Sequence, residues 1–408
     1  MDKSAAASNA IKLINQASEN INLRPSMIKA VCSYFDLMKG KELSQADKLF
    51  MHYLANKAGI PQYYNPMLEI GDTVDEEISL QTFSNFTQES SLVVGENIML
   101  HKYQKEVLNM FETGRRNRYF LSAATSFGKT FLIYEIIRKM GYSNIALIFP
   151  TISLLSENIF NIYTKPEYSW IKDNYTIHTL SETDSMGERN FFIFTPERYL
   201  SFIDKNDELS LDFVFVDEVY KLDNGFIIDE TPQENERDVA YRIALYELLK
   251  HESTDALLVG PYIKFPAADQ NGEQSSFQAF LDRYEFTPID YNQYDIVNKD
   301  EITIKSASTV KVDDTFSLTF SAKSKTIRLI ELVKQLLDKG ENTIIYCSQK
   351  ALTENKAKIL LQHGIGLDAV NDQRIIRLTN HIENLFEKRK GAQWILTKAL
   401  KKQYFGKF

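Results

Sequence analysis

The sequence is short of the residues that mark secreted and membrane proteins. Its 408 residues include two cysteines, Cys32 and Cys347, which lie far apart in apolar patterns. Two cysteines cannot supply a disulfide framework, so we expect core thiols in a reducing, cytoplasmic compartment. The longest apolar runs, such as residues 145–149, have the length of a strand and fall far short of the ~20 residues that span a bilayer. We therefore expect no membrane partner.

An excess of positive charge is also absent. The formal net charge is −8, which excludes a protein that is basic over its whole surface. Nucleic acid stays open as a partner, because a groove can be locally basic on an acidic body. With 44% hydrophobic and 25% charged residues, the composition is that of a globular protein with a large core. The length suggests roughly two to four domains.

Residues 1–95 are expected to form a helical accessory region that ends in a linker. Apolar residues recur at helical spacing over residues 13–21 and 28–38. Residues 44–47 resemble a capping box, and residues 72–92, which we assign to the linker, have no clear period. The region either binds a partner or nucleic acid, or it packs on the following domain. Packing is favoured because no motif lies in the region.

From residue 96 to 265, strand-like and helical stretches alternate. The expected strands are uninterrupted apolar runs at residues 119–122, 144–149, 176–180, 191–194, 213–216 and 256–259. Helical patterns fill the intervals. Such alternation is typical of an α/β fold with a parallel sheet covered on both faces, whose sites lie at the carboxyl ends of the strands.

The remainder is expected to contain a linker or insertion at residues 266–312 and a second domain at residues 313–408. Residues 327–337 have a helix pattern and residues 342–347 a strand pattern, with another helix from Ser348. This order predicts the opening of a second parallel sheet. The last stretch, from residue 376 to 408, is helical and basic, and its charges are either phosphate contacts or a solvated helix face.

The most specific pattern lies at residues 122–130. It joins an apolar strand to a helix and ends in Gly128, Lys129 and Thr130. In this context the backbone N–H groups of the loop face a polyphosphate, the lysine reaches the β- and γ-phosphates, and the threonine ligates Mg²⁺. A surface turn is the alternative, and the flanking strand and helix weigh against it. Ala123 departs from the pattern, since it stands at the position of the first glycine.

An acidic pair, Asp217 and Glu218, follows the apolar run 213–216. Downstream of a phosphate loop, such a pair supplies the second half of a nucleotide-hydrolysis site. Asp217 would hold Mg²⁺, and Glu218 would orient or deprotonate the attacking water. A solvated strand exit is the alternative. With Lys129, the pair forms the expected catalytic set.

In these motifs, residues 96–360 resemble the superfamily 2 helicases of the DEAD/DEAH-box type. Residues 100–104 resemble the stretch that places a glutamine on adenine, and residues 123–130 resemble the family's phosphate loop, where alanine at the first position is usual. Residues 217–220 fill the Asp-Glu-x-x box. The strand-end motifs of the family, which contact the nucleic-acid backbone, correspond to residues 150–151 and 195–198.

The resemblance implies a RecA-like motor domain, followed by a partial second RecA-like domain, that binds ATP, Mg²⁺ and single-stranded DNA or RNA of any sequence. The residues that it implies at the nucleotide are Gln104, Ala123, Thr125, Ser126, Phe127, Gly128, Lys129 and Thr130. Thr130 and Asp217 would hold the metal ion. The residues that it implies at the nucleic acid are Pro150, Thr151, Thr195, Pro196 and Arg198.

Two departures from the family pattern matter. Residues 260–262 read Gly-Pro-Tyr where the family has the Ser-Ala-Thr that couples hydrolysis to strand movement. The later motifs, whose arginines reach the γ-phosphate, are not found, and Arg374, Arg377 and Arg389 lie in no matching motif. The Thr-Ser-Phe-Gly-Lys-Thr form of the loop, together with the helical prefix, is similar to helicases of bacterial antiphage defence such as the Hachiman type.

The sequence therefore predicts an ATP-dependent helicase or translocase in truncated form, whose isolated chain binds ATP but hydrolyses it slowly. The alternative is a nucleotide-gated nucleic-acid-binding module that a partner chain completes. A purely structural protein is disfavoured by the intact loop and acidic pair. Nothing in the sequence distinguishes DNA from RNA, because the expected contacts are to phosphates and sugars.

Overall fold

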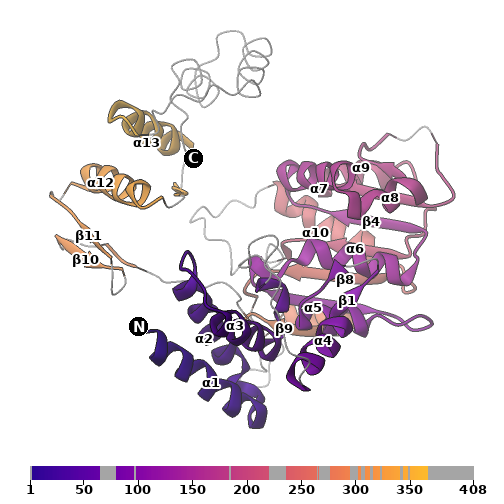
Figure 1. The fold of residues 1–408 in the computed structure, drawn as a ribbon. Helices are drawn as coiled ribbons and strands as arrows, with labels where there is room; N and C mark the ends of the chain where they lie inside the picture. The colour runs from indigo at the N-terminus through magenta and orange to yellow at the C-terminus, as the bar shows by residue number, and fades with distance from the viewer. Residues whose placement is uncertain are drawn as a thin grey trace, which may run out of the picture. The chain divides into compact units, whose positions relative to one another are not determined.

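The computed structural model describes residues 2–64, 80–95, 98–182, 185–219, 236–263, 265, 276–294, 302–304, 308–312, 316–321, 324–340, 343–347 and 350–365. The chain divides into two compact units, Met1–Asn298 and Lys299–Phe408 (Figure 1). Each unit is described by itself.

The first unit opens with a helical prefix. Its elements are α1 (Lys3–Glu19), η1 (Ile21–Leu23), α2 (Arg24–Met38), α3 (Gln45–Ala58), η2 (Pro61–Tyr63) and α4 (Leu80–Leu92). The predicted capping box is confirmed at the start of α3, where Ser44 Oγ accepts from Asp47 N and Asp47 Oδ2 accepts from Ser44 N, each at 3.2 Å. Gly59 ends α3 with a φ of +76°, a left-handed conformation that favours glycine.

The linker expected at residues 72–92 is wrong for its second part, which forms helix α4. Residues 80–92 are helical, and polar side chains of α4 bond to α3. Glu89 Oε1 lies 2.6 Å from His52 Nε2 and accepts from Asn56 Nδ2 at 2.7 Å. A polar segment without an apolar period is helical here because its partners stand on another helix. Residues 72–79 lie outside the described residues.

The rest of the first unit is built on a seven-stranded parallel sheet. Its strands are β3 (Arg118–Ala123), β4 (Asn144–Ile148), β5 (Thr176–His178), β6 (Asn190–Phe194), β7 (Phe213–Val216), β8 (Asp255–Gly260) and β9 (Thr287–Tyr291), in the order β5-β6-β4-β7-β8-β3-β9. A short antiparallel pair, β1 (Val93–Val94) and β2 (Ile98–Met99), precedes the sheet. Strands β3, β6, β7 and β8 are buried along their whole length, and the apolar runs within them made them predictable.

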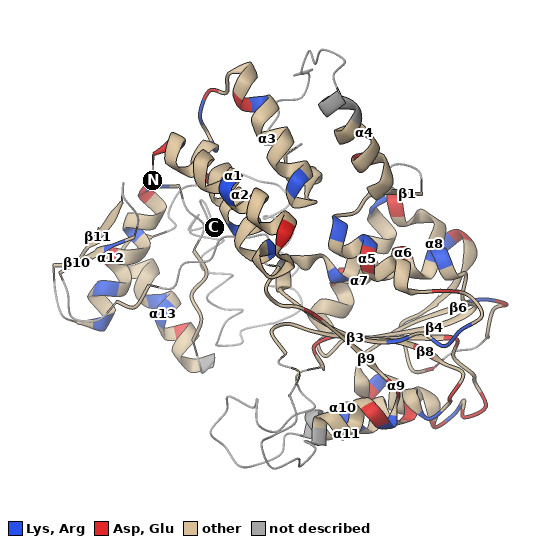
Figure 2. Cartoon of the chain, turned by 90° about the horizontal axis from the view of Figure 1, so that it is seen from below, with Lys and Arg blue, Asp and Glu red and all other residues tan. Residues whose placement is uncertain are grey.

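Helices cover both faces of the sheet (Figure 2). One face carries α5 (Lys102–Met110), α6 (Lys129–Met140), α7 (Ile152–Thr164) and α8 (Ser169–Asn174), and the other carries α9 (Pro196–Ile203), α10 (Glu236–Leu249) and α11 (Ser276–Arg283). The single turns η4 (Thr125–Phe127) and η5 (Pro166–Tyr168) lie in the connections before α6 and α8. The arrangement is the RecA-like α/β fold that the sequence predicts, with the helical region on its N-terminal side.

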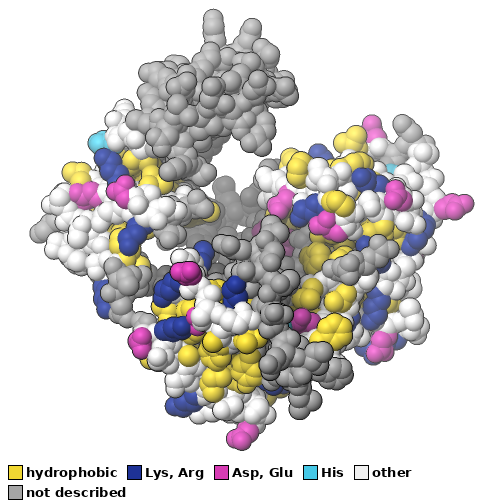
Figure 3. Space-filling view, in the orientation of Figure 1, with side chains coloured by type: hydrophobic (Ala, Val, Ile, Leu, Met, Phe, Trp, Pro, Cys, Tyr) yellow, Lys and Arg dark blue, Asp and Glu magenta, His cyan; other side chains and the backbone are white. Residues whose placement is uncertain are grey.

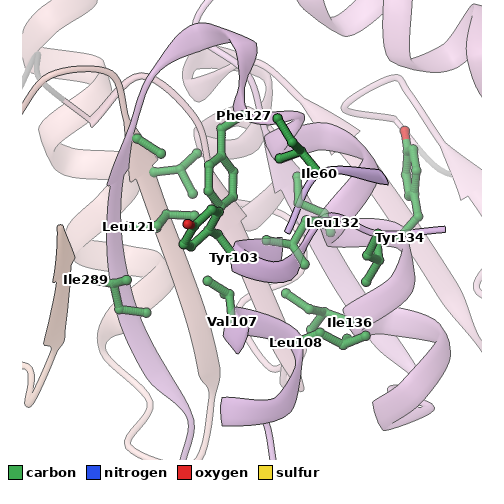
Figure 4. Close-up of a cluster of buried hydrophobic side chains, with 14 of the residues drawn as sticks. Ile60, Tyr103, Val107, Leu108, Leu121, Phe127, Leu132, Tyr134, Ile136 and Ile289 are labelled. Carbon is green, nitrogen blue, oxygen red and sulfur yellow. The ribbon is translucent and has the colours of Figure 1, made fainter. Parts of the chain in front are cut away.

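The helical prefix and the sheet share one hydrophobic core. Val31 of α2 and Met51 of α3 belong to the same buried cluster as Leu121 of β3 and Ile136 of α6. Figure 4 shows Ile60, which lies between α3 and η2 of the prefix, among side chains of α5 and α6. The prefix therefore packs on the α/β part, in line with the favoured interpretation.

Helix α11 and strand β9 lie within residues 266–312, which the sequence assigned to a linker or insertion. β9 pairs with β3 in parallel register, from Thr287 opposite Tyr119 to Tyr291 opposite Ala123. Pro288 has no N–H to donate, which restricts it to an edge strand and breaks the apolar pattern that marks the other strands. Residues 287–291 therefore belong to the sheet of the first unit, which the pattern did not predict.

The second unit contains a small antiparallel hairpin and two helices. The hairpin pairs β10 (Thr309–Lys311) with β11 (Ser317–Thr319), and the helices are α12 (Lys325–Asp338) and α13 (Lys350–Gln362). Ile330, Val333, Leu360 and Ile365 form its buried core. The helix expected at residues 327–337 is confirmed as α12.

The strand expected at residues 342–347 is wrong. Residues 343–347 form no strand, and Ile344 and Tyr346 are 97% and 89% exposed. A strand needs a neighbour for its backbone groups, and the described part of this unit offers these residues none. The expected second parallel sheet does not occur in that part. Ser348 and the basic tail lie outside the described residues.

None of the helices in the described part of the chain combines the length and the apolar character needed to cross a bilayer.

Candidate active site

The loop after β3 is shaped for close contact with an anion. The chain leaves β3 at Ala123, makes the single turn η4 and enters α6 through Gly128. Gly128 has a φ of +74°, and a Cβ there would stand 2.7 Å from Gln104 Nε2, so both conformation and space favour glycine. No side chain caps the start of α6, and its first N–H groups carry the positive end of the helix dipole.

Lys129 is folded back onto this loop. Its Nζ donates to the carbonyls of Ala123 at 3.1 Å and Ala124 at 3.0 Å. The same Ala124 carbonyl accepts from Phe127 N at 3.1 Å. The carbonyls of the loop thus hold the ammonium, and phosphate oxygens that enter the loop must compete with them.

The other nucleotide residues implied by the family occupy the same loop. Thr125 is exposed, Phe127 is buried and Thr130, the second residue of α6, is half-buried. Only the backbone of Ser126 is described. Figure 4 shows the Phe127 ring beside Tyr103 of α5, in the cluster beneath the loop.

The acidic pair lies at the carboxyl end of β7, on the same edge of the sheet as the loop. Burial raises the pKa of Asp217 to about 6, against the lowering effects of its bond from Glu218 N and of the positive charge of Lys129. Glu218 has a φ of +54°, uncommon for a residue with a side chain, and its N–H donates to Asp217 Oδ1 at 2.9 Å.

Gln104 is brought to the phosphate loop by the first turn of α5. Its Nε2 donates to the carbonyls of Phe127 at 2.9 Å and Gly128 at 3.3 Å. His101, the N-cap of α5, accepts from Gln104 N through Nδ1 and donates through Nε2 to the Phe127 carbonyl, both at 3.1 Å. In this structure Gln104 therefore fixes the loop, and its contact with adenine stays a prediction.

Burial lowers the pKa of His101 to about 4, so the imidazole is neutral near pH 7. A neutral ring has one donor and one acceptor nitrogen, and the two bonds use both. His101 lies inside the stretch that the sequence singled out, but its role depends on a contact with Phe127 that the pattern does not reveal.

Two threonines expected at the nucleic acid stand at neighbouring strand ends. Thr151 follows β4 and caps α7, with Oγ1 accepting from Leu154 N at 3.3 Å. Thr195 follows β6 and caps α9, with Pro196 in the first turn. The strands join at this edge through Phe149 N, which donates to the Phe194 carbonyl at 2.9 Å. Both threonines thus lie at helix N-termini on one rim, where backbone N–H groups favour phosphates.

The other two residues expected at the nucleic acid, Pro150 and Arg198, lie next to these threonines. Pro150 is the half-buried residue that precedes Thr151. Arg198 Nη1 donates to the Thr179 carbonyl at 2.9 Å, so its guanidinium holds the end of β5. A contact between Arg198 and nucleic acid stays a prediction, and it would have to share or replace this bond.

The Gly-Pro-Tyr segment, which begins with the last residue of β8, lies beside Val219, the residue after the acidic pair. A Cβ on Gly260 would stand 3.5 Å from Val219 N, an ordinary contact, and would overlap the end of the Ile263 side chain, so a larger residue would fit only if that side chain moved. Tyr262 has a φ of +56° and is 47% exposed. The segment therefore touches the backbone next to Glu218 without the hydroxyl groups of the family's Ser-Ala-Thr.

Sequence reasoning missed two polar residues beside the loop. Ser122 Oγ lies 2.8 Å from Asn292 Oδ1 and 2.9 Å from the Ile263 carbonyl. Ser122 immediately precedes the phosphate loop, so its position in the sequence could have indicated a role at the site. Asn292 comes just after β9, in a segment assigned to a linker or insertion, and no sequence pattern indicated a role for it.

The residues present fit a magnesium nucleotide. Gly128 leaves room for a phosphate beside the backbone, Lys129 and the α6 N-terminus supply positive charge, and Thr130 and Asp217 are oxygen ligands of the kind that Mg²⁺ prefers. Among the described residues, no group of three or more His, Cys, Asp and Glu side chains is placed to hold a metal ion by itself. A magnesium ion here would therefore depend on phosphate oxygens as well as on the protein.

The fold and these residues define a RecA-like domain with a helicase-type region. The model of the family described as "Type III restriction enzyme, res subunit" matches residues 97–248, which include the loop and the acidic pair. The chain is also similar to a protein of Escherichia coli (strain K12) named "Anti-bacteriophage protein B", with 23% identity over 274 residues. That match covers 67% of this chain and 33% of the relative, so the chain spans about a third of the relative's length.

Proposed function

We propose that this chain is the ATP-binding part of a nucleic-acid helicase or translocase. The observation that carries the proposal is that Lys129, at the start of α6, and Asp217, directly after β7, stand at the same edge of the parallel sheet, because β3 and β7 are the two neighbours of β8. The helicase-type family match over residues 97–248 supports it. The name of the Escherichia coli relative supports a role in antiphage defence, and the Hachiman type remains a prediction.

Each residue has a definite task in this proposal. Lys129 exchanges its bonds to the loop carbonyls for phosphate oxygens, and the N–H groups of α6 add to its charge. Thr130 and Asp217 hold Mg²⁺, which when bound supplies positive charge at the phosphate oxygens. Glu218 orients the attacking water, and Gln104 is placed to read the adenine edge once the loop has adjusted.

Substituting Lys129 tests the nucleotide part of the proposal. Lys129→Ala removes the charge-assisted bonds to phosphate, so we expect the affinity for Mg-ATP to fall roughly 10- to 100-fold in isothermal titration. Lys205→Ala is the charge-matched control, because Lys205 pairs with Glu182 on the surface, where its side chain is 57% exposed. Equal affinity of the Lys129 variant and the control, with unchanged circular dichroism, would reject the proposal.

The alternative function, a nucleotide-gated binding module, predicts a different steady state. A motor releases phosphate faster when a single strand is added, whereas a module binds ATP and the strand without turnover. Phosphate release with and without single-stranded DNA and RNA separates the two. The same assay identifies the preferred nucleic acid, which the described contacts leave open because they suit phosphates rather than bases.

A further inference from the structure

The residues just after the last strand of the sheet bind both ends of the phosphate loop. We call residues 291–294, which are the end of β9 and the three residues that follow, the exit segment. Asn292 Nδ2 donates to the Ile263 carbonyl at 2.7 Å, and Asn292 Oδ1 lies 2.8 Å from Ser122 Oγ. Ser122 is fully buried and directly precedes Ala123, so this contact holds the start of the loop.

The far end of the loop is held by aromatic contacts. The Tyr291 ring stacks on Phe127, with centroids 5.8 Å apart, and the Tyr294 ring lies 4.3 Å from that of Tyr103. Tyr291 also donates its hydroxyl proton to Glu106 Oε2 at 2.9 Å. Phe127 is the last residue of the η4 turn, so the exit segment bridges the loop from Ser122 to Phe127.

The exit segment holds the phosphate loop in one particular conformation. In that conformation, Lys129 donates to carbonyls of the loop itself. For the lysine to reach phosphate, its bonds to Ala123 and Ala124 must open, and the η4 turn shares the Ala124 carbonyl through Phe127 N. Movement of that turn disturbs the packing of Phe127 on Tyr291. Nucleotide and exit segment therefore favour different conformations of one loop.

We propose that Asn292 is a positioning residue which, with Tyr291 and Tyr294, holds the phosphate loop closed, and that Mg-ATP binding loosens the exit segment. This inference rests on the proposed function of the loop. The exit segment ends four residues before Asn298, the end of the first unit, so a nucleotide-dependent release would act close to the boundary of that unit. Linkage fixes the sign: if ATP weakens these contacts, then removing the contacts must strengthen ATP binding by the same factor.

The experiment compares the binding of a non-hydrolysable ATP analogue with Mg²⁺ by isothermal titration in four proteins. Asn292→Ala is expected to bind the analogue about fivefold more tightly than the wild type, because the work of breaking the contacts is removed. Asn292→Asp, which keeps the acceptor for Ser122 but loses the donor to Ile263, should fall between them. Gln293→Ala, an exposed neighbour in the same segment, is the matched control and should leave the affinity unchanged.

Hydrogen exchange gives a second measurement that is independent of affinity. The Tyr294 amide donates to the Tyr291 carbonyl at 3.1 Å, and we expect its exchange to accelerate several-fold when the wild type binds the analogue. In Asn292→Ala the exchange should already be fast and should respond little to nucleotide.

A merely structural role for Asn292 predicts weaker binding after its removal, so weakened or unchanged affinity of Asn292→Ala overturns the inference and leaves the proposed function intact. Failure of the wild type to bind the analogue rejects both. Tighter binding with unaltered exchange in the wild type also overturns the inference.

Discussion

His101 is the buried residue on which α5 and the phosphate loop both depend. It caps the helix through Nδ1 and holds the Phe127 carbonyl through Nε2, and it packs edge-on against the Phe127 ring at 4.8 Å. Protonation would turn Nδ1 from an acceptor into a donor facing the Gln104 N–H. The cap and the site therefore require the neutral form.

The low pKa of His101 predicts a loss of stability in acid. The unfolded imidazole titrates near pH 6.5 and the folded one near pH 4, because burial disfavours the charged form. Between these values the unfolded chain binds a proton that the folded chain does not, so the free energy of unfolding falls as the pH falls, by roughly 3 kcal/mol at pH 4. Urea unfolding of the first unit from pH 7.5 to 4 measures this slope.

His101→Asn keeps a capping side chain but removes the titrating group, so its unfolding free energy should depend less steeply on pH. His251→Asn, at an exposed position of the same unit, is the control and should follow the wild type. Parallel curves for all three proteins would contradict the assignment.

The sequence could predict residues whose chemistry is local and missed those whose partners are distant. Lys129 and Asp217 stand in short patterns with a defined context, and the structure places both at one edge of the sheet, although their roles await the tests above. Ser122 and Asn292 are 170 positions apart, and nothing near either residue indicates the other. Such pairs arise from the register of β3 with β9, which is a property of the folded sheet.

Among helices and strands too, those with a local sequence pattern were predicted and those that depend on distant partners were missed. Strands buried on both faces were predicted because their apolar runs are unbroken, whereas β9 was missed because it is an edge strand that contains Pro288. Helix α4 was missed because its polar residues serve the neighbouring helix α3. Residues 343–347 show the opposite case. Their sequence has a strand pattern, but they form no strand, and the described part of the second unit offers them no neighbouring strand.

The docking of α4 on α3 depends on Glu89. Burial alone would raise the pKa of Glu89, but bonds from His52 and Asn56 outweigh it, and the pKa is lowered. Glu89→Ala removes the carboxylate to which these two partly buried groups bond, so we expect a loss of about 1–3 kcal/mol in the free energy of unfolding. Urea denaturation measures it, with Glu42→Ala, at an exposed position of the prefix, as the control. A loss no larger than that of the control would show that α4 is held by other contacts.

At the scale of the whole molecule, charge sets how nucleic acid can bind. The net charge is −8, and Figure 3 shows Lys and Arg side chains interspersed with Asp and Glu on the viewed face. Binding must therefore come from a local arrangement, and the rim formed by Thr151 and Thr195 at two helix N-termini is the one that we propose.

This arrangement predicts strand binding that depends on salt but not on base sequence. Each phosphate neutralised by a cationic side chain should lower the logarithm of the binding constant by about 0.7 per tenfold rise in salt. A contact made by neutral N–H groups and hydroxyls should contribute far less. We therefore expect the plot of the logarithm of the binding constant against the logarithm of the salt concentration to have a slope that corresponds to only a few neutralised phosphates. Filter binding of single-stranded DNA and RNA of mixed and uniform sequence measures it. A steep slope would point to a basic surface elsewhere, and a strong preference for one sequence would contradict backbone contact.

The strand order of the sheet also has a consequence for biosynthesis. β3 lies between β8 and β9, and both of its neighbours come much later in the chain: Asn117, just before β3, bonds to Asp255 across 138 positions. A ribosome adds about 5–20 residues per second, so a nascent β3 waits roughly seven to thirty seconds for its first partner. During that time a six-residue segment that is apolar apart from Arg118 and Ser122, and that is buried along its whole length in the finished protein, has no neighbouring strand. We expect this segment to be a chaperone-binding sequence in the nascent chain, which ribosome profiling of chaperone-bound chains would detect before residue 255 is made and lose after residue 291.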